Sequence, residues 1–167
     1  NPFVFGHSMG GYVGLELLKL RPLKLTLVHS NFWEDSPKKK YDRDRLIGIV
    51  EKNKTLLVRE SIPYLFTSAN RVACEATIQK LISKACEIPK NEIIAASRGL
   101  RDRSENGYLL DLHDISMIQG DNDPVVPLET LENELKKRQR KPKIHLIENC
   151  AHMSIWEDPE ALINSIK

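Results

Sequence analysis

Four short apolar runs, separated by helical patterns, predict a parallel β-sheet. The first run, at residues 3–5, meets a helical pattern at about 11–20 that stops at Arg21-Pro22, and the second run follows directly. A strand, a helix and another strand with short links form a βαβ unit, and such a unit makes its two strands parallel. Further helices are expected at 128–137 and from about Pro159, since proline suits a first helical turn. The four predicted strands are 3–5, 23–29, 114–119 and 143–147.

The middle of the chain, from Asn31 to about Asn106, has helical patterns but no strand pattern. Asn70 and Asn91 are expected to cap helices, with breaks at Pro63, Pro89 and Gly99. An all-helical insertion between strands of a parallel sheet predicts a lid, although such helices could also cover one face of the sheet. The predicted organisation is core sheet over 1–32, helical lid over 33–106 and core sheet over 107–167. The expected helices are 40–53, 55–65, 70–86 and one from 91.

Composition adds limits rather than chemistry. The chain is 41% hydrophobic, which is enough for a core, and its net charge of +2 gives no general case for binding nucleic acid or a membrane. No apolar run is long enough to span a bilayer. Cys74, Cys86 and Cys150 are too few and too scattered for a disulfide framework or a metal site, which favours reduced thiols in the cytoplasm. We expect no metal and no cofactor.

The segment Gly6-His7-Ser8-Met9-Gly10 joins the first predicted strand to the first predicted helix. A serine at the apex of such a sharp turn adopts a strained backbone conformation that exposes its hydroxyl. Gly6 and Gly10 are expected to let the strand and the helix pass close to each other, since they lack a Cβ. The N–H groups at the helix start could bind an oxyanion. The alternative is a tight turn with an idle serine.

A nucleophilic serine needs a base, and the base needs a carboxylate that orients it. In a parallel sheet these groups belong in loops that follow the carboxyl ends of strands. Asp123 follows the third predicted strand and His152 follows the fourth, so the order along the chain is Ser, Asp, His. Asp121 is an alternative acid, and Cys150 is an alternative nucleophile that would leave Ser8 without a role.

These motifs together resemble the C-terminal part of an α/β-hydrolase, over nearly all of this chain. The stretch 6–11 is similar to the family's nucleophile elbow, and Gly120-x-x-Asp123-Pro124-x-x-Pro127 resembles its acid loop. Ala151-His152 and the stretch 157–160 resemble its histidine loop and terminal helix. The resemblance implies Ser8 as nucleophile, His152 as general base and then acid, and Asp123 as the orienting carboxylate. It also implies the Met9 N–H as one oxyanion donor.

The resemblance implies a serine hydrolase that cleaves an ester, thioester or lactone of a small-molecule substrate, with a lid like those of small esterases and enol-lactonases. The alternatives are a C–C hydrolase or acyltransferase with the same triad, or a binding protein of the hydrolase fold without catalysis. Four aromatic residues could line an acyl pocket or equally pack in the core. They are Phe32, Trp33, Tyr64 and Phe66.

The chain also departs from the family pattern at its start, where it opens on Asn1 within a predicted strand. We therefore expect a fragment that lacks the family's early strands and the loop that supplies the second oxyanion N–H. The strand between Phe3 and Phe5 would then have an unpaired edge, which invites association with another chain or with the missing N-terminal half. The isolated fragment is expected to be inactive or nearly so.

Overall fold

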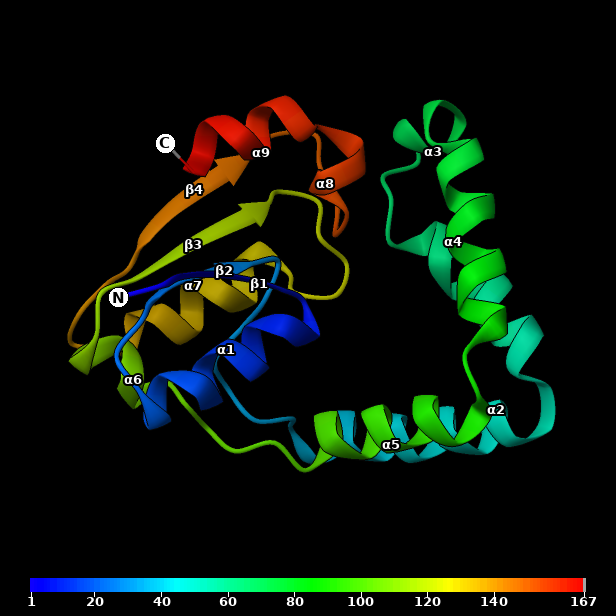
Figure 1. Cartoon of the computed structure of the whole chain (residues 1–167), viewed down its shortest axis with the longest axis horizontal. Coiled ribbons are helices and arrows are strands. Elements are labelled where there is room, and N and C mark those ends of the chain that lie inside the picture. Colours follow the sequence, from blue (N-terminus) through cyan, green and yellow to red (C-terminus); the bar gives the residue numbers. More distant parts are fainter. Residues whose placement is uncertain (167) are drawn as a thin grey trace. The chain divides into compact units, whose positions relative to one another are not determined.

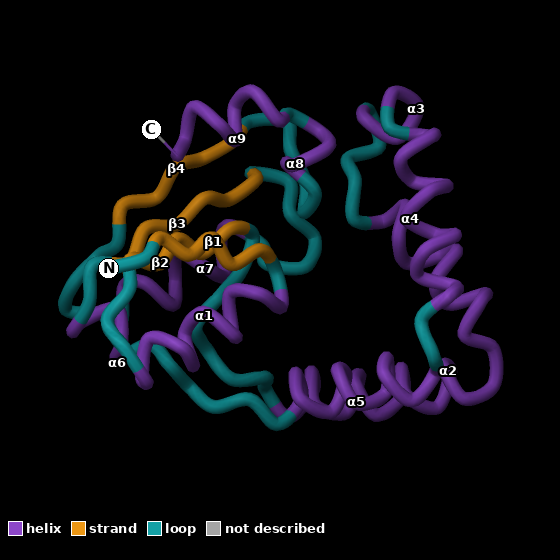
Figure 2. Tube along the Cα trace, viewed as in Figure 1, coloured by secondary structure: helices purple, strands orange, loops and turns teal. Residues whose placement is uncertain are grey.

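The computed structural model describes residues 1–166 and divides into two units. The sheet unit consists of Asn1–Trp33 and the segment that starts at Glu105, and the helical unit is Glu34–Ser104 (Figure 1). Every strand lies in the sheet unit, whereas the described residues of the helical unit form helices and loops (Figure 2). Residue 167, the last of the predicted segment 107–167, lies outside the described residues.

The sheet is parallel throughout, as the sequence predicts. Its order is β1-β2-β3-β4, so each strand pairs with its neighbours in the sequence. Gly6 of β1 lies beside Leu27 of β2, and Met117 of β3 lies between Leu27 and Ile144 of β4. The carboxyl ends of all four strands therefore meet at one edge of the sheet. The strands are β1 (Phe3–His7), β2 (Lys24–Val28), β3 (Ile115–Gly120) and β4 (Lys143–Ile147).

Both faces of the sheet are covered by helices, and alternate strand residues face each side. The larger core joins Leu27 and Met117 to α1 (Met9–Leu20), α6 (Tyr108–Leu112) and α7 (Leu128–Lys136). On the other face, Val28, Ile118 and Ile147 pack with α9 (Pro159–Ile166), which follows the short α8 (Ser154–Glu157). Figure 1 shows α1, α6 and α7 on one side of the strands and α9 on the other.

The helical unit contains α2 (Pro37–Tyr64), α3 (Asn70–Ala73), α4 (Glu75–Glu87) and α5 (Lys90–Arg101). The two helices expected at 40–53 and 55–65 form one element, α2, which is kinked where Asn53 has non-helical dihedrals (φ −152°, ψ 74°). Asn53 Oδ1 accepts a hydrogen bond from the Leu56 N–H at 3.1 Å. This side chain therefore caps the second half of α2 and stabilises the kink.

The predicted caps of the later helices are wrong. Asn70 is the first residue of α3 rather than its cap, and its N–H donates to Thr67 Oγ1 at 3.1 Å. Asn91 lies inside α5, which begins one residue after Pro89. Proline favours that position because its fixed φ suits the entry to a helix. Gly99 lies within α5 and does not break it.

A buried carboxylate holds together the beginning and the end of the helical unit. Asp35 Oδ2 lies 3.0 Å from Arg43 Nε, and Asp35 Oδ1 lies 2.9 Å from Arg103 Nη2. Both carboxylate oxygens are thus paired with guanidinium groups, which satisfies the charge of a side chain that has little access to water.

The strand β1 lies at one edge of the described sheet and pairs with β2. The exposed fractions of Phe3 and Phe5 are 68% and 46%. Lys24 Nζ lies 4.7 Å from the centre of the Phe3 ring, a cation–π contact at this surface. Among the described residues, no helix is both long and apolar enough to cross a membrane.

Candidate active site

Ser8 occupies the sharp turn between β1 and α1. Its dihedrals, φ 50° and ψ −118°, lie outside the regions that residues with a side chain usually adopt, so the predicted strain is present. The Ser8 N–H donates to the Val28 carbonyl at 2.9 Å, and the Ser30 hydroxyl donates to the Ser8 carbonyl at 2.8 Å. Hydrogen bonds of both its N–H and its carbonyl therefore hold Ser8 in this strained conformation.

Two glycines let α1 approach its neighbours closely, but only one of them is a predicted one. A Cβ on Gly6 would lie 2.6 Å from the Gly10 oxygen and from the Gly11 Cα. The prediction for Gly10 is wrong, since a Cβ there would meet open space. Gly11 is the crowded position instead, because a Cβ there would overlap the Ser30 side chain. Gly6 thus permits the close approach of β1 and α1, and Gly11 permits that of α1 and the residue Ser30 after β2.

The structure brings Ser8, His152 and Asp123 into one hydrogen-bonded chain. His152 Nε2 lies 2.8 Å from Ser8 Oγ, and His152 Nδ1 lies 2.9 Å from Asp123 Oδ2. An ionised carboxylate can only accept, so Nδ1 carries the proton and Nε2 is left to accept from the Ser8 hydroxyl. This is the arrangement in which an imidazole can remove the proton of a serine.

Asp123 is buried and almost fully satisfied by hydrogen bonds. Its Oδ1 accepts from the N–H groups of Val125 at 2.8 Å and Val126 at 3.0 Å. Its Oδ2 accepts from His152 and, at 3.0 Å, from Gln119 Nε2. Burial acts to raise the pKa of Asp123, but the hydrogen bonds from its histidine partners outweigh it and hold the pKa well below its usual range. The group is therefore a carboxylate at neutral pH.

Asp121, the alternative acid, has another partner. Its Oδ1 accepts from the Cys150 N–H at 3.1 Å and from Asn122 Nδ2 at 2.7 Å. It therefore ties the turn after β3 to the loop that carries His152. The geometry favours Asp123 over Asp121 as the partner of the histidine.

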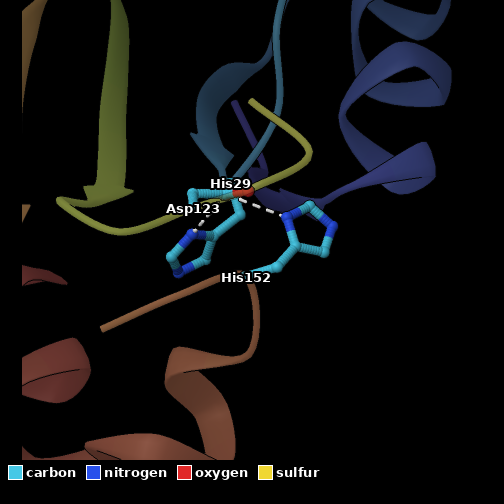
Figure 3. A group of neighbouring side chains, drawn as sticks. All are labelled: His29, Asp123 and His152. Atoms are coloured by element: carbon cyan, nitrogen blue, oxygen red, sulfur yellow. Dashed lines mark hydrogen bonds and ion pairs between the residues drawn. The ribbon is translucent and has the colours of Figure 1, made fainter. Parts of the chain in front are cut away.

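Sequence reasoning missed His29 and Ser154, which lie beside these residues. His29 Nδ1 is 3.1 Å from Asp123 Oδ2, and His29 Nε2 is 2.7 Å from Ser154 Oγ. Figure 3 shows the rings of His29 and His152 on two sides of Asp123, each joined to its carboxylate. His29 directly follows β2. The rule that located Asp123 and His152, loops at the carboxyl edge, therefore also applies to this position.

His7 holds the loop that carries His152 through a hydrogen bond to its backbone. Its Nε2–H donates to the His152 carbonyl at 2.8 Å, and its ring centre lies 5.2 Å from that of His152. Burial lowers the pKa of His7 below its ordinary value and outweighs the hydrogen bond to the His152 carbonyl, which acts to raise it. The ring is therefore neutral at pH 7, consistent with a supporting role.

The loop that carries His152 is held by its neighbours on both sides. Glu157 Oε2 accepts from the N–H groups of Ala151 at 3.0 Å and Met153 at 3.3 Å. Gly120, at the end of β3, lies so close to the Cys150 and Ala151 carbonyls that a Cβ would overlap them. Burial, together with the charge of Glu157, raises the pKa of the Cys150 thiol. That thiol is protonated, which disfavours it as a nucleophile.

The predicted oxyanion donor lies at the start of α1, and the predicted pocket residues are divided between the sheet unit and the helical unit. Met9 is the first residue of α1, so its N–H has no carbonyl partner within the helix. Phe32 is buried in the larger core of the sheet unit, and the ring of Trp33 packs edge-on against it at 5.1 Å. In the helical unit, Tyr64 is exposed at the end of α2 and Phe66 is buried. Core packing thus accounts for Phe32, and the acyl pocket stays a prediction.

His29, Asp123 and His152 also place three groups that can ligate a metal within 4.8 Å of one another. The surrounding N–H groups do not suit a cation. Gln119 Nε2 donates to Asp123 Oδ2 at 3.0 Å, and the Gly120 N–H lies 3.4 Å from His29 Nδ1. A cation at this place would face these donors, so the cluster fits a hydrogen-bond network better than a metal centre.

Comparison with known proteins rests on structure, since neither a protein-family model nor a curated protein matches the sequence. A thermophilic esterase from Thermogutta terrifontis is similar with a TM-score of 0.84 and 24% identity, over 98% of this chain and 62% of that one. An esterase from Exiguobacterium antarcticum gives 0.80 and 18%, over 97% and 63%. The enol-lactonase from Burkholderia xenovorans gives 0.78 and 14%, over 97% and 62%.

This chain thus spans a little over three fifths of the length of the similar structures. At these identities the likeness concerns the fold, which includes the parallel sheet and the all-helical insertion. The resemblance read from the motifs is confirmed at that level: the chain has the fold of the α/β-hydrolases, over part of its usual length.

Proposed function

We propose that the protein is a serine hydrolase that cleaves an ester, thioester or lactone through an acyl-enzyme. The observation that carries the proposal is the hydrogen-bonded chain from Ser8 Oγ through His152 to Asp123. It lies at the carboxyl edge of the parallel sheet, where ligands bind in folds of this class. The strained backbone of Ser8 adds support, since strain of this kind collects at functional sites.

Each residue has one role in the proposed reaction. Ser8 Oγ attacks the carbonyl carbon while its proton passes to His152 Nε2, and Asp123 stabilises the imidazolium that forms. The Met9 N–H donates to the oxyanion of the tetrahedral intermediate. His152 then returns its proton to the leaving alcohol, thiol or lactone oxygen, and the acyl-enzyme remains. Water, activated by the same histidine, hydrolyses the acyl-enzyme and frees Ser8.

The similar proteins named as esterases and as an enol-lactonase support a small-molecule acyl substrate. A C–C hydrolase or an acyltransferase would use the same three residues with a different substrate or acceptor. A panel of p-nitrophenyl esters, thioesters, lactones and vinylogous diketones separates these reactions. The substrate class on which turnover is fastest identifies the reaction.

We also propose that the helical unit is a lid, since the chain enters it after β2 and returns from it before β3. Lids of such enzymes close over bound substrate and order on doing so. Labelling Ser8 with a phosphonate that carries a long acyl-like chain should therefore slow amide exchange in α2, α4 and α5. Equal exchange before and after labelling contradicts a lid.

The central test is labelling with a fluorophosphonate, together with turnover of p-nitrophenyl acetate and butyrate by the full-length protein. Ser8→Ala should abolish labelling and lower turnover by at least about 1,000-fold, because a triad without its nucleophile loses nearly all its activity. Ser83→Ala, at an exposed serine of α4, is the matched control and should keep both. A wild-type protein with neither labelling nor turnover would favour a binding protein.

The activity of the 167-residue chain alone is a separate proposal. This chain alone is expected to be inactive or nearly so. It is also expected to associate through β1, whose Phe3 and Phe5 side chains are exposed at the sheet edge. Turnover and solution mass of this chain, beside those of any longer form of the protein, provide the test. Comparable turnover from a monomeric 167-residue chain contradicts it.

A further inference from the structure

His29 is completely buried and has an unusual backbone conformation. It follows β2 with φ 47°, in the left-handed region that disfavours residues with a side chain. Its N–H still donates to the Ile118 carbonyl at 2.9 Å, so it extends the pairing of β2 with β3 by one step before the chain turns. Such a conformation persists only where the surroundings hold it, and it concentrates at functional sites.

Both ring nitrogens of His29 have a buried partner. Nδ1 faces Asp123 Oδ2 at 3.1 Å (Figure 3). Nε2 faces Ser154 Oγ at 2.7 Å. The Asp123 carboxylate only accepts, and at 3.1 Å it lies closer to Nδ1 than the Gly120 nitrogen does at 3.4 Å, so Nδ1 carries the proton and forms its hydrogen bond with Asp123. Nε2 then accepts from the Ser154 hydroxyl. The side chains of His29 and Asp123 have no exposed surface, so water cannot replace either bond.

These two bonds connect the two loops that carry the partners of Ser8. Asp123 lies in the turn after β3, and Ser154 follows His152 by two residues at the start of α8. A rigid ring anchored on β2 therefore sets the distance between the acid loop and the histidine loop. It does so through atoms that do not reach Ser8, since it is His152 that contacts the serine.

We propose that His29 is a positioning residue of this site, which holds Asp123 and, through Ser154, the loop of His152 in the geometry that serves Ser8. The proposal rests on the proposed hydrolase function. His29 takes no proton from the substrate and touches none of the reacting atoms. Its effect is on the placement of the base, where a displacement of about 1 Å can cost roughly 100-fold in rate.

Three substitutions in the full-length protein separate positioning from bulk packing. His29→Leu keeps the volume but removes both bonds. His29→Asn keeps a donor near the place of Nδ1 and tolerates a positive φ, but it cannot reach Ser154. Ser154→Ala removes only the bond to Nε2. His113→Asn, at a half-buried histidine just before β3, is the matched control and should change nothing.

We expect His29→Leu to lower kcat by about 30- to 100-fold with KM within threefold, since the base moves while the acyl site stays. His29→Asn should recover most of that loss, and Ser154→Ala should cost about three- to tenfold. A general packing defect predicts instead that Leu, which fills the space, is better tolerated than Asn. A higher kcat for His29→Leu than for His29→Asn overturns the proposal. A kcat of His29→Leu within threefold of wild type overturns it as well.

A second measurement does not depend on activity. The Nδ1 proton of His152, bonded to Asp123 at 2.9 Å, is expected to give a downfield proton resonance in the wild-type protein. It should shift or broaden in His29→Leu and Ser154→Ala and stay in place in the control. If the wild-type protein hydrolyses no ester, the proposed function fails, and this resonance still decides whether His29 positions His152. An unchanged resonance in both variants overturns the positioning role.

Discussion

The sheet unit and the helical unit are built in different ways. In the sheet unit, helices cover both faces of the strands, and fully buried leucines such as Leu15, Leu27 and Leu131 join three helices to the sheet. The helical unit has a smaller buried core, whereas large apolar side chains are exposed in both units. In the helical unit the buried apolar residues are Ile47, Val50, Val58, Phe66, Cys74, Ile78 and Ile82, and the exposed ones include Tyr41, Ile49, Leu56, Tyr64, Val72 and Ile88.

This contrast separates two tasks. Every member of the proposed triad belongs to the sheet unit, where dense packing and shared hydrogen bonds can hold atoms within tenths of an ångström. A thinly packed helical unit can change shape at small cost, which suits the lid role that we propose for it. Changes in the sheet unit should therefore affect the chemical step, and changes in the helical unit should affect stability and substrate choice.

The largest difference between the units is expected for Asp123→Asn. An amide cannot hold the imidazole in the tautomer that accepts a proton from Ser8, and kcat should fall by about 10,000-fold. Asp42→Asn, at an exposed aspartate of α2, is the matched control in the helical unit and should stay within threefold. Steady-state kinetics on p-nitrophenyl butyrate measures both. Equal losses in the two variants would contradict the separation of tasks.

Much of the sheet unit could be predicted from the sequence because its signals are local. Apolar runs bounded by breakers located the four strands, and one topological rule placed Asp123 and His152 near Ser8. His29 was missed because the predicted strand 23–29 included it, which placed it inside a strand rather than in a loop at the carboxyl edge. Its two partners, Asp123 and Ser154, are 94 and 125 residues away along the chain.

The sequence predicted that the helical unit consists of helices, but it did not predict where these helices begin and end. Its helices were expected, but their boundaries depend on which of several nearby groups binds the free N–H groups at a helix start. Thr67 rather than Asn70 has that role before α3, and Pro89 precedes α5. The exposed apolar residues of this unit blur its helical pattern further.

A second expected difference concerns the stability of the helical unit. Asp35→Asn removes the charge that neutralises Arg43 and Arg103, and it should lower the free energy of unfolding of this unit by about 3 kcal/mol. Asp44→Asn, whose partner Arg101 is at an exposed surface, should cost less than about 1 kcal/mol. Limited proteolysis under urea measures opening of the helical unit. Equal protection of the two variants contradicts the role given to Asp35.

A third difference should appear in the wild-type protein itself. The free energy of opening is expected to be about 2 kcal/mol lower for amides of α2, α4 and α5 than for those of β2 and β3. Their exchange should therefore be roughly 30-fold faster. The reason is the smaller buried core of the helical unit. Hydrogen exchange followed by mass spectrometry resolves the two groups of peptides. Uniform protection over both units would mean that they unfold together, and the contrast in their packing would have no dynamic consequence.

The smallest expected effect is a dependence of stability on pH that comes from His7 in the sheet unit. Burial lowers the pKa of His7 from its ordinary value of 6.5, so the unfolded chain binds a proton at this position at a higher pH than the folded one does. Stability should therefore decline as the pH falls below about 6.5, and the decline should end below the folded pKa of His7. The low pKa of Asp123 acts in a separate pH range, because its contribution to stability is present above about pH 4 and is lost only in stronger acid.

His7→Gln removes the titrating group but keeps a donor for the His152 carbonyl, and it should flatten the curve of stability against pH between pH 7 and 5. His113→Gln, at a histidine outside the proposed triad, is the control for the loss of a histidine as such. Urea denaturation at each pH measures the difference, and an equal slope in His7→Gln and wild type would show that another group sets the acid response of the sheet unit.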